Sequence, residues 1–456
     1  MKSIISSIKI AALGFFVLSS CELLDVKPDH VVPEEIAFND VESYQMALNY
    51  VYRNLTSSVN NMQCTDFASD DFQGVIPGYA PTNYYLHYWD YQSQPQPYVW
   101  GYQYKLIANE NVLINNYDLV PVGSEYDAQM KDYIYAQALA LRSWSLFNVA
   151  QLYAPRYDGS NGNEVGIPLK LNLALEYLAP APIGKVYQQI FDDLDKAERL
   201  MLATGHRPSL YDKPYQFNID AIRALRARVA LFTGNYDLAG QAAAHFIDVP
   251  LLDKEQYPML WQDEFGSENQ EIIFMTHDLS DTDDADLIDY HEIYESNNAI
   301  LHNDLLAAFS ADDVRKQSAF IDAKNMPAKY IIAAADNKGQ ADRNLHYKHF
   351  RVAEQYLIYA EAVLDSNPQE AMRVLNILRE KRGAELLSAV PDKAEVLEER
   401  RKELFAEGLR FYDLKRLSHE LNIVVQRANG AVLVPNSPLY NWAVPREETN
   451  SNPNYN

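Results

Sequence analysis

Apolar residues recur at every third or fourth position in several long stretches of the chain. One stretch runs through Val186, Ile190, Leu194, Ala197 and Met201. This spacing places the apolar side chains on one face of an α-helix, where they can pack against a core. The hydrophobic pattern therefore predicts a mainly α-helical protein.

Two segments are each typical of a pair of helices joined by a tight turn. In the first, helical periodicity ends at Gly234–Tyr236, and a second helix is predicted from Asp237 to about Phe246. In the second, a helix ends at Ser366–Pro368, where Asn367 can cap the next helix and Pro368 fits its first turn. Gly383 can end that next helix.

The two pairs share a layout that is typical of tetratricopeptide-type helical hairpins. Ala239 and Ala371 each follow the start of their turn by five residues, which puts a small side chain where the helices cross. The units are far apart and lack the usual early tryptophan, so a uniform solenoid is not expected. We expect helical hairpins that support a large, loop-rich subdomain, with hairpins at about 103–247 and 346–417 and irregular, ligand-facing parts at about 60–100, 252–345 and 418–456.

The first residues are typical of an export signal rather than of the fold. Residues 1–20 combine two lysines with a short apolar run. The stretch "LSSC" at residues 18–21 is similar to a bacterial lipobox with Cys21 as the lipidated residue. The alternative is an ordinary signal peptide followed by a chance cysteine. Residues 21–40 are then a tether, and the folded domain spans 41–456, with a first helix at Val41–Asn54.

Composition narrows the classes of function. Among 456 residues, 39 are basic and 63 acidic, which gives a formal net charge of −24 and argues against nucleic-acid binding. A neutral sugar meets no such barrier. Cys64 is the only cysteine besides Cys21, so cysteine-based zinc sites and CxxC redox chemistry are excluded.

The chain contains no sequence motif of a nucleotide-binding loop, a nucleophile elbow or a zinc protease. The acidic run Asp281–Asp286 could bind calcium, but it lacks the glycine and distal glutamate of a calcium loop, and a solvated acidic loop is the favoured interpretation. We therefore expect no catalytic residues, no cofactor and no metal site.

The most informative segment for binding lies between Tyr79 and Tyr104. It holds eight tyrosines and two tryptophans, interrupted by three prolines. Rings at this density on a polar loop either pack as a satellite core or form a binding surface. We expect packing for Trp100, Tyr102 and Tyr104. The predicted ligand-binding residues are Tyr84, Tyr85, Tyr88, Trp89 and Tyr91, joined by Tyr290 and Tyr294 from a later irregular stretch.

Residues 398–417, "EERRKELFAEGLRFYDLKRL", crowd charges around an apolar stripe. Either an active site or a structural clamp could require this. Helical spacing predicts ion pairs of Glu398 with Arg401 or Lys402, and of Glu407 with Arg410. Gly408 weakens a helix, so it indicates a close backbone approach or a bend.

This charged segment closely resembles the C-terminal signature of the SusD/RagB family of outer-membrane nutrient-binding lipoproteins. The matching residues are Glu399, Arg400, Glu403, Leu404, Glu407, Gly408, Arg410, Asp413, Leu414 and Arg416. "LLDVKP", "ALRARVALFTGNYDLA" and the hairpin after residue 351 also resemble the family. Ala443 departs from it by replacing the first proline of a common Pro-x-Pro element, whereas Pro445 and "NPN" remain.

The resemblance implies a scaffold role for the charged segment. It also implies lipid anchoring on the outer face of the outer membrane and a partner SusC-like TonB-dependent transporter, to which such proteins deliver oligosaccharides or, in some cases, peptides. The family's binding residues lie in variable loops, so no site residue carries over. An oligosaccharide-binding lipoprotein and a helical-repeat lipoprotein that binds peptide or protein both remain open.

Overall fold

A computed structural model describes residues 38–55, 59–76, 81–91, 99–206, 213–261, 270–276, 294–329 and 347–455. The protein is mainly α-helical, as predicted, and its strands form only short pairs in these ranges. The predictions for Cys21, Tyr290 and Asp281–Asp286 fall outside the described residues.

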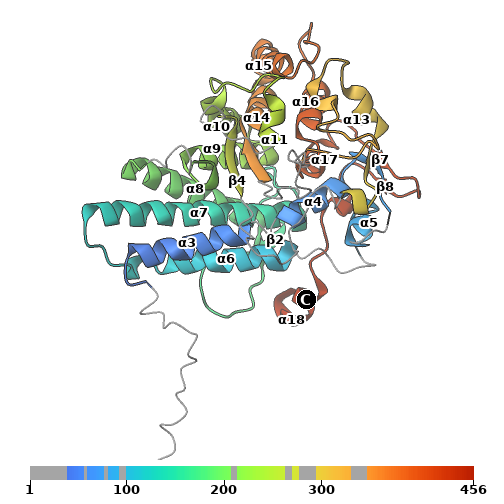
Figure 1. Cartoon of the computed structure of the whole chain (residues 1–456). Helices are drawn as coiled ribbons and strands as arrows, with labels where there is room; N and C mark the ends of the chain where they lie inside the picture. Colours follow the sequence, from blue (N-terminus) through green and yellow to red (C-terminus); the bar gives the residue numbers. More distant parts are fainter. Residues whose placement is uncertain are drawn as a thin grey trace, which may run out of the picture.

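Four long helices lie side by side in the lower half of the molecule in Figure 1. They are α3 (Val41–Leu55), α6 (Val99–Asn115), α7 (Glu125–Tyr153) and α8 (Ile183–Thr204). Helix α7 packs between α6 and α8, and α3 packs on both α6 and α7. The apolar stripe predicted for residues 186–201 is buried along α8. Trp100 is buried there, and Tyr102 and Tyr104 pack against the core, as expected.

A second layer contains the two predicted hairpins, α9 (Ile219–Thr233) with α10 (Tyr236–Ala243) and α14 (Val352–Val363) with α15 (Pro368–Lys381). The predicted cap Asn367 accepts a backbone N–H of the helix that follows, and Asn235 does the same at the first hairpin. Ala239 and Ala371 are completely buried. The predicted crossing positions are therefore confirmed.

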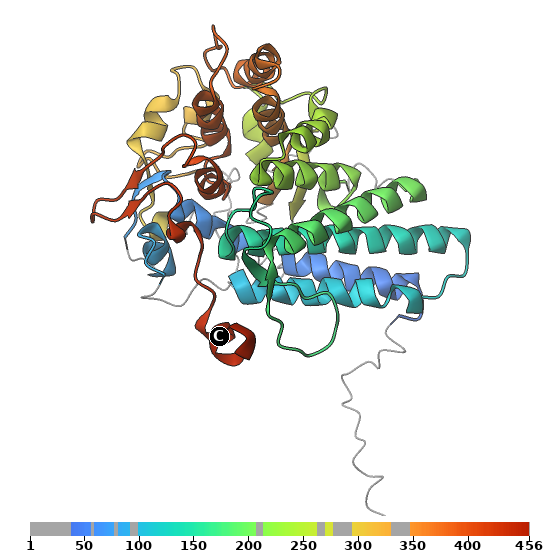
Figure 2. The ribbon, with the colours of Figure 1, turned by 180° about the vertical axis from the view of Figure 1, so that it is seen from behind.

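The helical array is interrupted between α10 and α14, which pack together although more than a hundred residues separate them. The intervening residues and the chain ends build the irregular subdomain beside the array (Figures 1 and 2). Its helices and strands are α4 (Val59–Ala68), β1 (Phe72–Gly74), α5 (Pro81–His87), α11 (Tyr257–Trp261), β5 (Ile300–Leu301), α13 (Asn303–Ala308), α16 (Lys393–Leu404), α17 (Arg410–Leu417), β7 (Val425–Gln426), β8 (Val432–Leu433) and α18 (Arg446–Ser451). The strands β4 (Ile272–Thr276) and β6 (Tyr347–Arg351) instead pack against α9 of the array.

Pairing in the described strands is antiparallel and two-stranded: β1 with β5, β4 with β6, β7 with β8, and β2 (Val165–Pro168) with β3 (Pro180–Pro182). The short 3₁₀ turns are η2 (Tyr117–Leu119), η3 (Lys213–Tyr215), η4 (Ala244–Phe246), η5 (Val314–Lys316), η6 (Pro438–Tyr440) and η7 (Pro453–Tyr455). None of the helices in the described part of the chain has the length and hydropathy needed to cross a bilayer.

The charged segment forms two helices, α16 and α17, rather than one. The chain turns between them because Ala406 and Gly408 adopt positive φ angles of 59° and 74°, a conformation that cannot continue a right-handed helix. The Gly408 backbone meets α4: its N–H donates to Asp66 Oδ1 at 2.9 Å, and its carbonyl accepts from Thr65 Oγ1 at 2.6 Å. The expected close backbone approach at Gly408 is confirmed.

Charges in this segment point inward and find partners from distant parts of the chain. Glu403 lies within 3.2 Å of guanidinium nitrogens of Arg315, Arg351 and Arg382. Glu407 pairs with Lys329 and Arg351, both at 2.8 Å. The predicted pairing of Glu407 with Arg410 is wrong, because Arg410 instead binds Asp70 at 2.7 Å.

We call Glu271, Glu403, Glu407, Arg315, Lys329, Arg351 and Arg382 the buried ion-pair network. Burial alone would raise the pKa of Glu403, but the three surrounding guanidinium groups together hold it well below its usual range. The network joins α15, α16, β6 and the loops around them. It acts as a structural clamp, which is the second of the two interpretations raised by the sequence.

Candidate functional site

The tyrosine-rich loop contains a short helix, α5, that ends in an unusual turn. The N–H of Trp89 donates to the carbonyl of Leu86 at 3.1 Å, and that of Asp90 donates to the carbonyl of Tyr85 at 3.0 Å. This double closure is a Schellman motif, whose left-handed position glycine usually occupies. Trp89 occupies it here with a φ of 54°, a costly conformation for a bulky side chain.

The cost of this turn is offset by burial of the Trp89 ring. Only 3% of the residue is exposed, and its Nε1 donates to the carbonyl of Ala68 at 2.9 Å. Trp89 thus fixes the end of α5 against α4. It presents no open face to a ligand in this structure, contrary to the exposure that the sequence suggested.

Arg427, which follows β7, holds the same turn from the other side. Its guanidinium group lies 4.7 Å from the centre of the Trp89 ring and donates to the carbonyls of Ser69, Phe72 and His87. Burial lowers the pKa of Arg427 to about 10, which still leaves it charged at neutral pH. Sequence analysis missed this residue because a lone arginine in a polar hairpin carries no signal.

Tyr84 and Tyr85 on α5 and Tyr88 in the turn after it are half-buried, and we call these three residues the tyrosine cluster. The centre of the Tyr84 ring lies 5.6 Å from that of Tyr85 and 4.8 Å from that of Tyr88, both edge to face. Partial burial, followed by the neighbouring Tyr84, raises the pKa of Tyr88, so its hydroxyl stays protonated and can donate. The cluster therefore offers aromatic surface with polar tips, as predicted from the sequence.

The structure does not add the other predicted tyrosines to this cluster. Tyr91 is partly buried, with its hydroxyl donating to the carbonyl of Leu439 at 2.8 Å. Tyr294 is 1% exposed, and its hydroxyl donates to Asp66 Oδ2 at 2.8 Å, so it packs in the core between α4 and β1. Ligand contact by these residues stays a prediction, and the described structure gives them structural partners.

The cluster is tied to the charged segment through the end of α4. Arg401 binds Asp71 at 2.8 Å, Arg410 binds Asp70 at 2.7 Å, and the Gly408 N–H binds Asp66. These contacts fix the segment that carries the carbonyls held by Arg427. An unbroken chain of contacts therefore connects the charged segment to the tyrosine cluster, although only the cluster reaches the surface.

Two other kinds of chemistry to consider among the described residues are metal binding and proton exchange near neutral pH. No group of three or more His, Cys, Asp or Glu side chains within them is placed to hold a metal ion. His87 beside the cluster is buried, and burial lowers its pKa to about 3, so it stays neutral. The tyrosine cluster is the candidate site that the sequence and the structure share.

Family models match two parts of the chain. One, described as "SusD family", matches residues 308–455, which include the buried ion-pair segment. The other, described as "Starch-binding associating with outer membrane", matches residues 22–231, which include the tyrosine cluster. Together they cover most of the chain, on both sides of the interruption in the helical array.

Individual relatives are similar over nearly their whole length. SusD-like protein P38 of Formosa agariphila is 21% identical over 480 residues, which cover 90% of each chain. A structure described as a putative sugar binding protein from Bacteroides vulgatus is 23% identical with a TM-score of 0.77, covering 92% of this chain and 98% of that one. Surface glycan-binding protein A from Bacteroides uniformis is 18% identical with a TM-score of 0.71, covering 91% and 98%. At these identities the structural likenesses show the fold.

Proposed function

The chain belongs to the SusD family, and from this premise we propose that it is a lipid-anchored protein of the outer-membrane surface that binds nutrient oligosaccharides and delivers them to a partner SusC-like TonB-dependent transporter. The proposal is for binding without catalysis. The family descriptions support a location at the outer membrane and a glycan as the ligand. The lipobox-like "LSSC" supports a lipid anchor at Cys21.

The tyrosine cluster is the observation that supports a glycan as the ligand. A pyranose presents a face of C–H groups and a rim of hydroxyls, which suits aromatic rings whose hydroxyls can donate. Tyr84, Tyr85 and Tyr88 offer three such rings within five residues of the chain. Because each ring contributes modestly, an oligosaccharide fits the surface better than a monosaccharide.

Calorimetric titration of the purified protein against a panel of oligosaccharides and peptides tests the ligand class. We expect an oligosaccharide to bind and the double variant Tyr84→Ala/Tyr88→Ala to weaken it about tenfold or more. Tyr126→Ala, at an exposed tyrosine of α7, is the matched control and should not change affinity. Binding of peptides alone, or unchanged affinity in the double variant, would overturn the proposed ligand or its site.

Anchoring and delivery need separate tests. Cys21→Ser should stop incorporation of labelled fatty acid and release the protein from the membrane fraction. Incorporation of label into the variant would place the anchor elsewhere. Co-purification of the wild-type protein with an outer-membrane barrel is the expected sign of a transporter partner, and recovery without any barrel would argue against delivery through one.

A further inference from the structure

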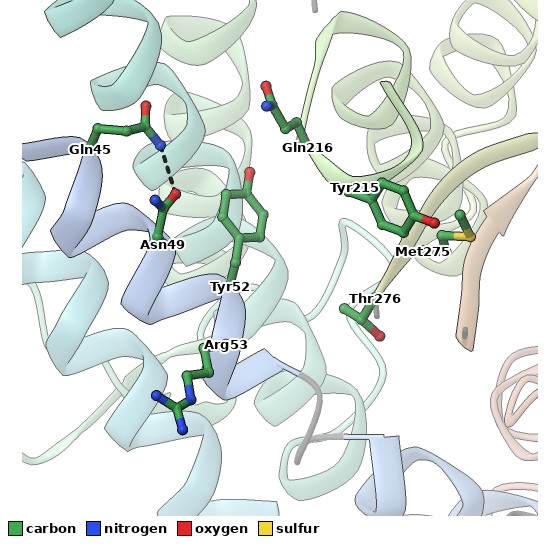
Figure 3. A pocket seen from close by; sticks show the side chains of 8 residues that line it. All are labelled: Gln45, Asn49, Tyr52, Arg53, Tyr215, Gln216, Met275 and Thr276. Carbon is green, nitrogen blue, oxygen red and sulfur yellow. Dashed lines mark hydrogen bonds between the residues drawn. The ribbon is translucent and has the colours of Figure 1, made fainter. Parts of the chain in front are cut away.

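A pocket of about 430 Å³ lies away from the tyrosine cluster, between α3, the turn after η3 and the end of β4 (Figure 3). Its volume falls within the range of about 300–1,000 Å³ that is typical of small-molecule sites. The residues that line it are none of those predicted from the sequence to bind a ligand.

One wall of the pocket is the outer face of α3. Gln45, Asn49 and Arg53 follow at intervals of four residues, so they share one side of the helix, while Tyr44, Leu48, Val51 and Leu55 are buried on the other. Figure 3 shows these three side chains along the helix, with the Tyr52 ring projecting beside them. The helical period thus gives α3 both a core face and a polar pocket wall.

The floor is apolar and fixed. Tyr52 donates to Gln137 Oε1 at 2.6 Å and accepts from the Phe217 N–H at 2.8 Å, which leaves its ring as the part that faces the pocket. Met275, opposite, is almost completely buried, and the Tyr215 ring lies beside it. A ligand would meet the half-buried rings of Tyr52 and Tyr215, with Met275 packed behind them.

The rim offers mainly hydrogen-bond donors. The Asn49 side-chain oxygen accepts from Gln45, which leaves the Asn49 amide NH₂ directed to solvent. Gln216 uses its oxygen to accept from Tyr133, which likewise leaves its NH₂ available. With the guanidinium of Arg53, the pocket presents three sets of donors to an oxygen-rich ligand.

The charges of the residues that line the pocket narrow the class of ligand further. Among the described residues that line the pocket there is no carboxylate, in a chain with 63 acidic residues. Arg53 forms no ion pair with any described residue, whereas Arg142, Arg228 and Arg410 each lie within 2.8 Å of a carboxylate oxygen. Within the described part of the chain, an exposed arginine without an ion pair, on a wall without carboxylates, favours a ligand with a negative group.

We propose that this pocket binds an acidic sugar, a pyranose that carries a carboxylate. The carboxylate pairs with Arg53, the ring hydroxyls accept from Asn49 and Gln216, and the C–H face lies on Tyr52 and Tyr215. The preference for an anion follows from the pocket itself, while the choice of a sugar rests on the proposed function. The site is separate from the tyrosine cluster and would recognise a charged unit of the same class of ligand.

The test compares methyl glucuronide with methyl glucoside, which differ in the carboxylate, by ligand-observed NMR on the purified protein. We expect the glucuronide to bind about tenfold more tightly. Arg53→Gln should abolish that preference, Arg53→Lys should keep most of it, and raising the salt should weaken it because the ion pair is exposed. Arg199→Gln, at an exposed arginine of α8 outside the pocket, is the charge-matched control and should behave as wild type.

Equal binding of the two glycosides, or a preference that survives Arg53→Gln, would overturn the assignment. N-acetyl-leucine, which has a carboxylate without a sugar, should bind more weakly than the glucuronide, and equal binding would overturn the sugar but not the anion. The variant Tyr84→Ala/Tyr88→Ala should still bind the glucuronide. Loss of oligosaccharide binding with the glucuronide retained, or the reverse, separates a failure of one site from a failure of the other.

Discussion

The buried ion-pair network and the tyrosine cluster are both conspicuous in the sequence, yet they occupy opposite environments. Glu403 and its guanidinium partners are completely buried and saturate one another, whereas the rings of Tyr84, Tyr85 and Tyr88 are half-buried and touch mainly each other. The dense charges therefore belong to the core here, whereas the dense aromatic residues divide between packed rings such as Trp89 and the half-buried cluster. The side that a group faces, rather than its chemical type, decides whether it can bind a ligand.

The largest expected effect is at the centre of the network. Glu403→Gln removes the charge that three buried guanidinium groups share and should lower the free energy of unfolding by about 3–5 kcal/mol, measured by denaturant titration. Glu398→Gln, on the same helix but with an exposed side chain, should cost less than about 0.5 kcal/mol. Equal costs for the two variants would mean that the network is not a clamp.

Variants at Trp89 and Tyr88 distinguish residues of the tyrosine-rich loop that stabilise the fold from residues that bind the ligand. Trp89→Ala removes a buried indole and its bond to the carbonyl of Ala68, so we expect a loss of about 3 kcal/mol in stability together with weaker glycan binding. Tyr88→Ala should weaken binding at little cost in stability. A Trp89→Ala protein that is as stable as wild type but does not bind the glycan would mean that Trp89 contacts the ligand directly.

These contrasts mark what the sequence could predict. Periodicity and capping residues such as Asn367 act within a few positions, so the hairpins were predicted with their turns. The break between α16 and α17 was predicted only as one alternative, a bend at Gly408, because a positive φ at Ala406 has no signature in the residue type. Glu407 was assigned a helical neighbour, whereas its partners Lys329 and Arg351 are set by tertiary contacts that outweigh spacing.

The candidate site was predicted only in part, because tertiary contacts also decide which aromatic rings are exposed. The aromatic loop could be recognised, but which rings turn inward depends on Arg427, more than 300 residues away. The pocket on α3 was not predicted, because Gln45, Asn49 and Arg53 form a polar helix face of an ordinary kind until β4 and Tyr215 close it.

A smaller effect is expected at the turn of the charged segment. Gly408→Ala places a side chain on a residue with a φ of 74° and should cost about 1–2 kcal/mol of stability without changing glycan affinity. Gly101→Ala, within α6 and facing open space, should instead stabilise by about 0.5–1 kcal/mol. If Gly408→Ala abolished binding at unchanged stability, the charged segment would belong to the site after all.

The smallest expected effect concerns Asp66, which joins the two regions by accepting from the Gly408 N–H and from Tyr294. Burial, with Asp71 and Glu407 nearby, raises the pKa of Asp66 to about 8, from 3.8 in an unfolded chain. The folded state therefore holds a proton that the unfolded state has released between these values. Its contribution to stability is full below about pH 4 and is lost as the pH rises through about 8.

Asp66→Asn cannot ionise but keeps an oxygen for the Gly408 N–H. Between pH 5 and 8 the wild-type protein should lose stability faster than the variant as the pH rises, by no more than about 1.4 kcal/mol per pH unit for one proton. Denaturant titrations at each pH measure the difference. Glu110, whose pKa burial also raises to about 8, lies between α6 and α7, so Glu110→Gln controls for buried carboxylates in general. Parallel stability curves for wild type and Asp66→Asn would show that Asp66 is ionised in the folded state, and that the contact between clamp and site is an ordinary charged hydrogen bond.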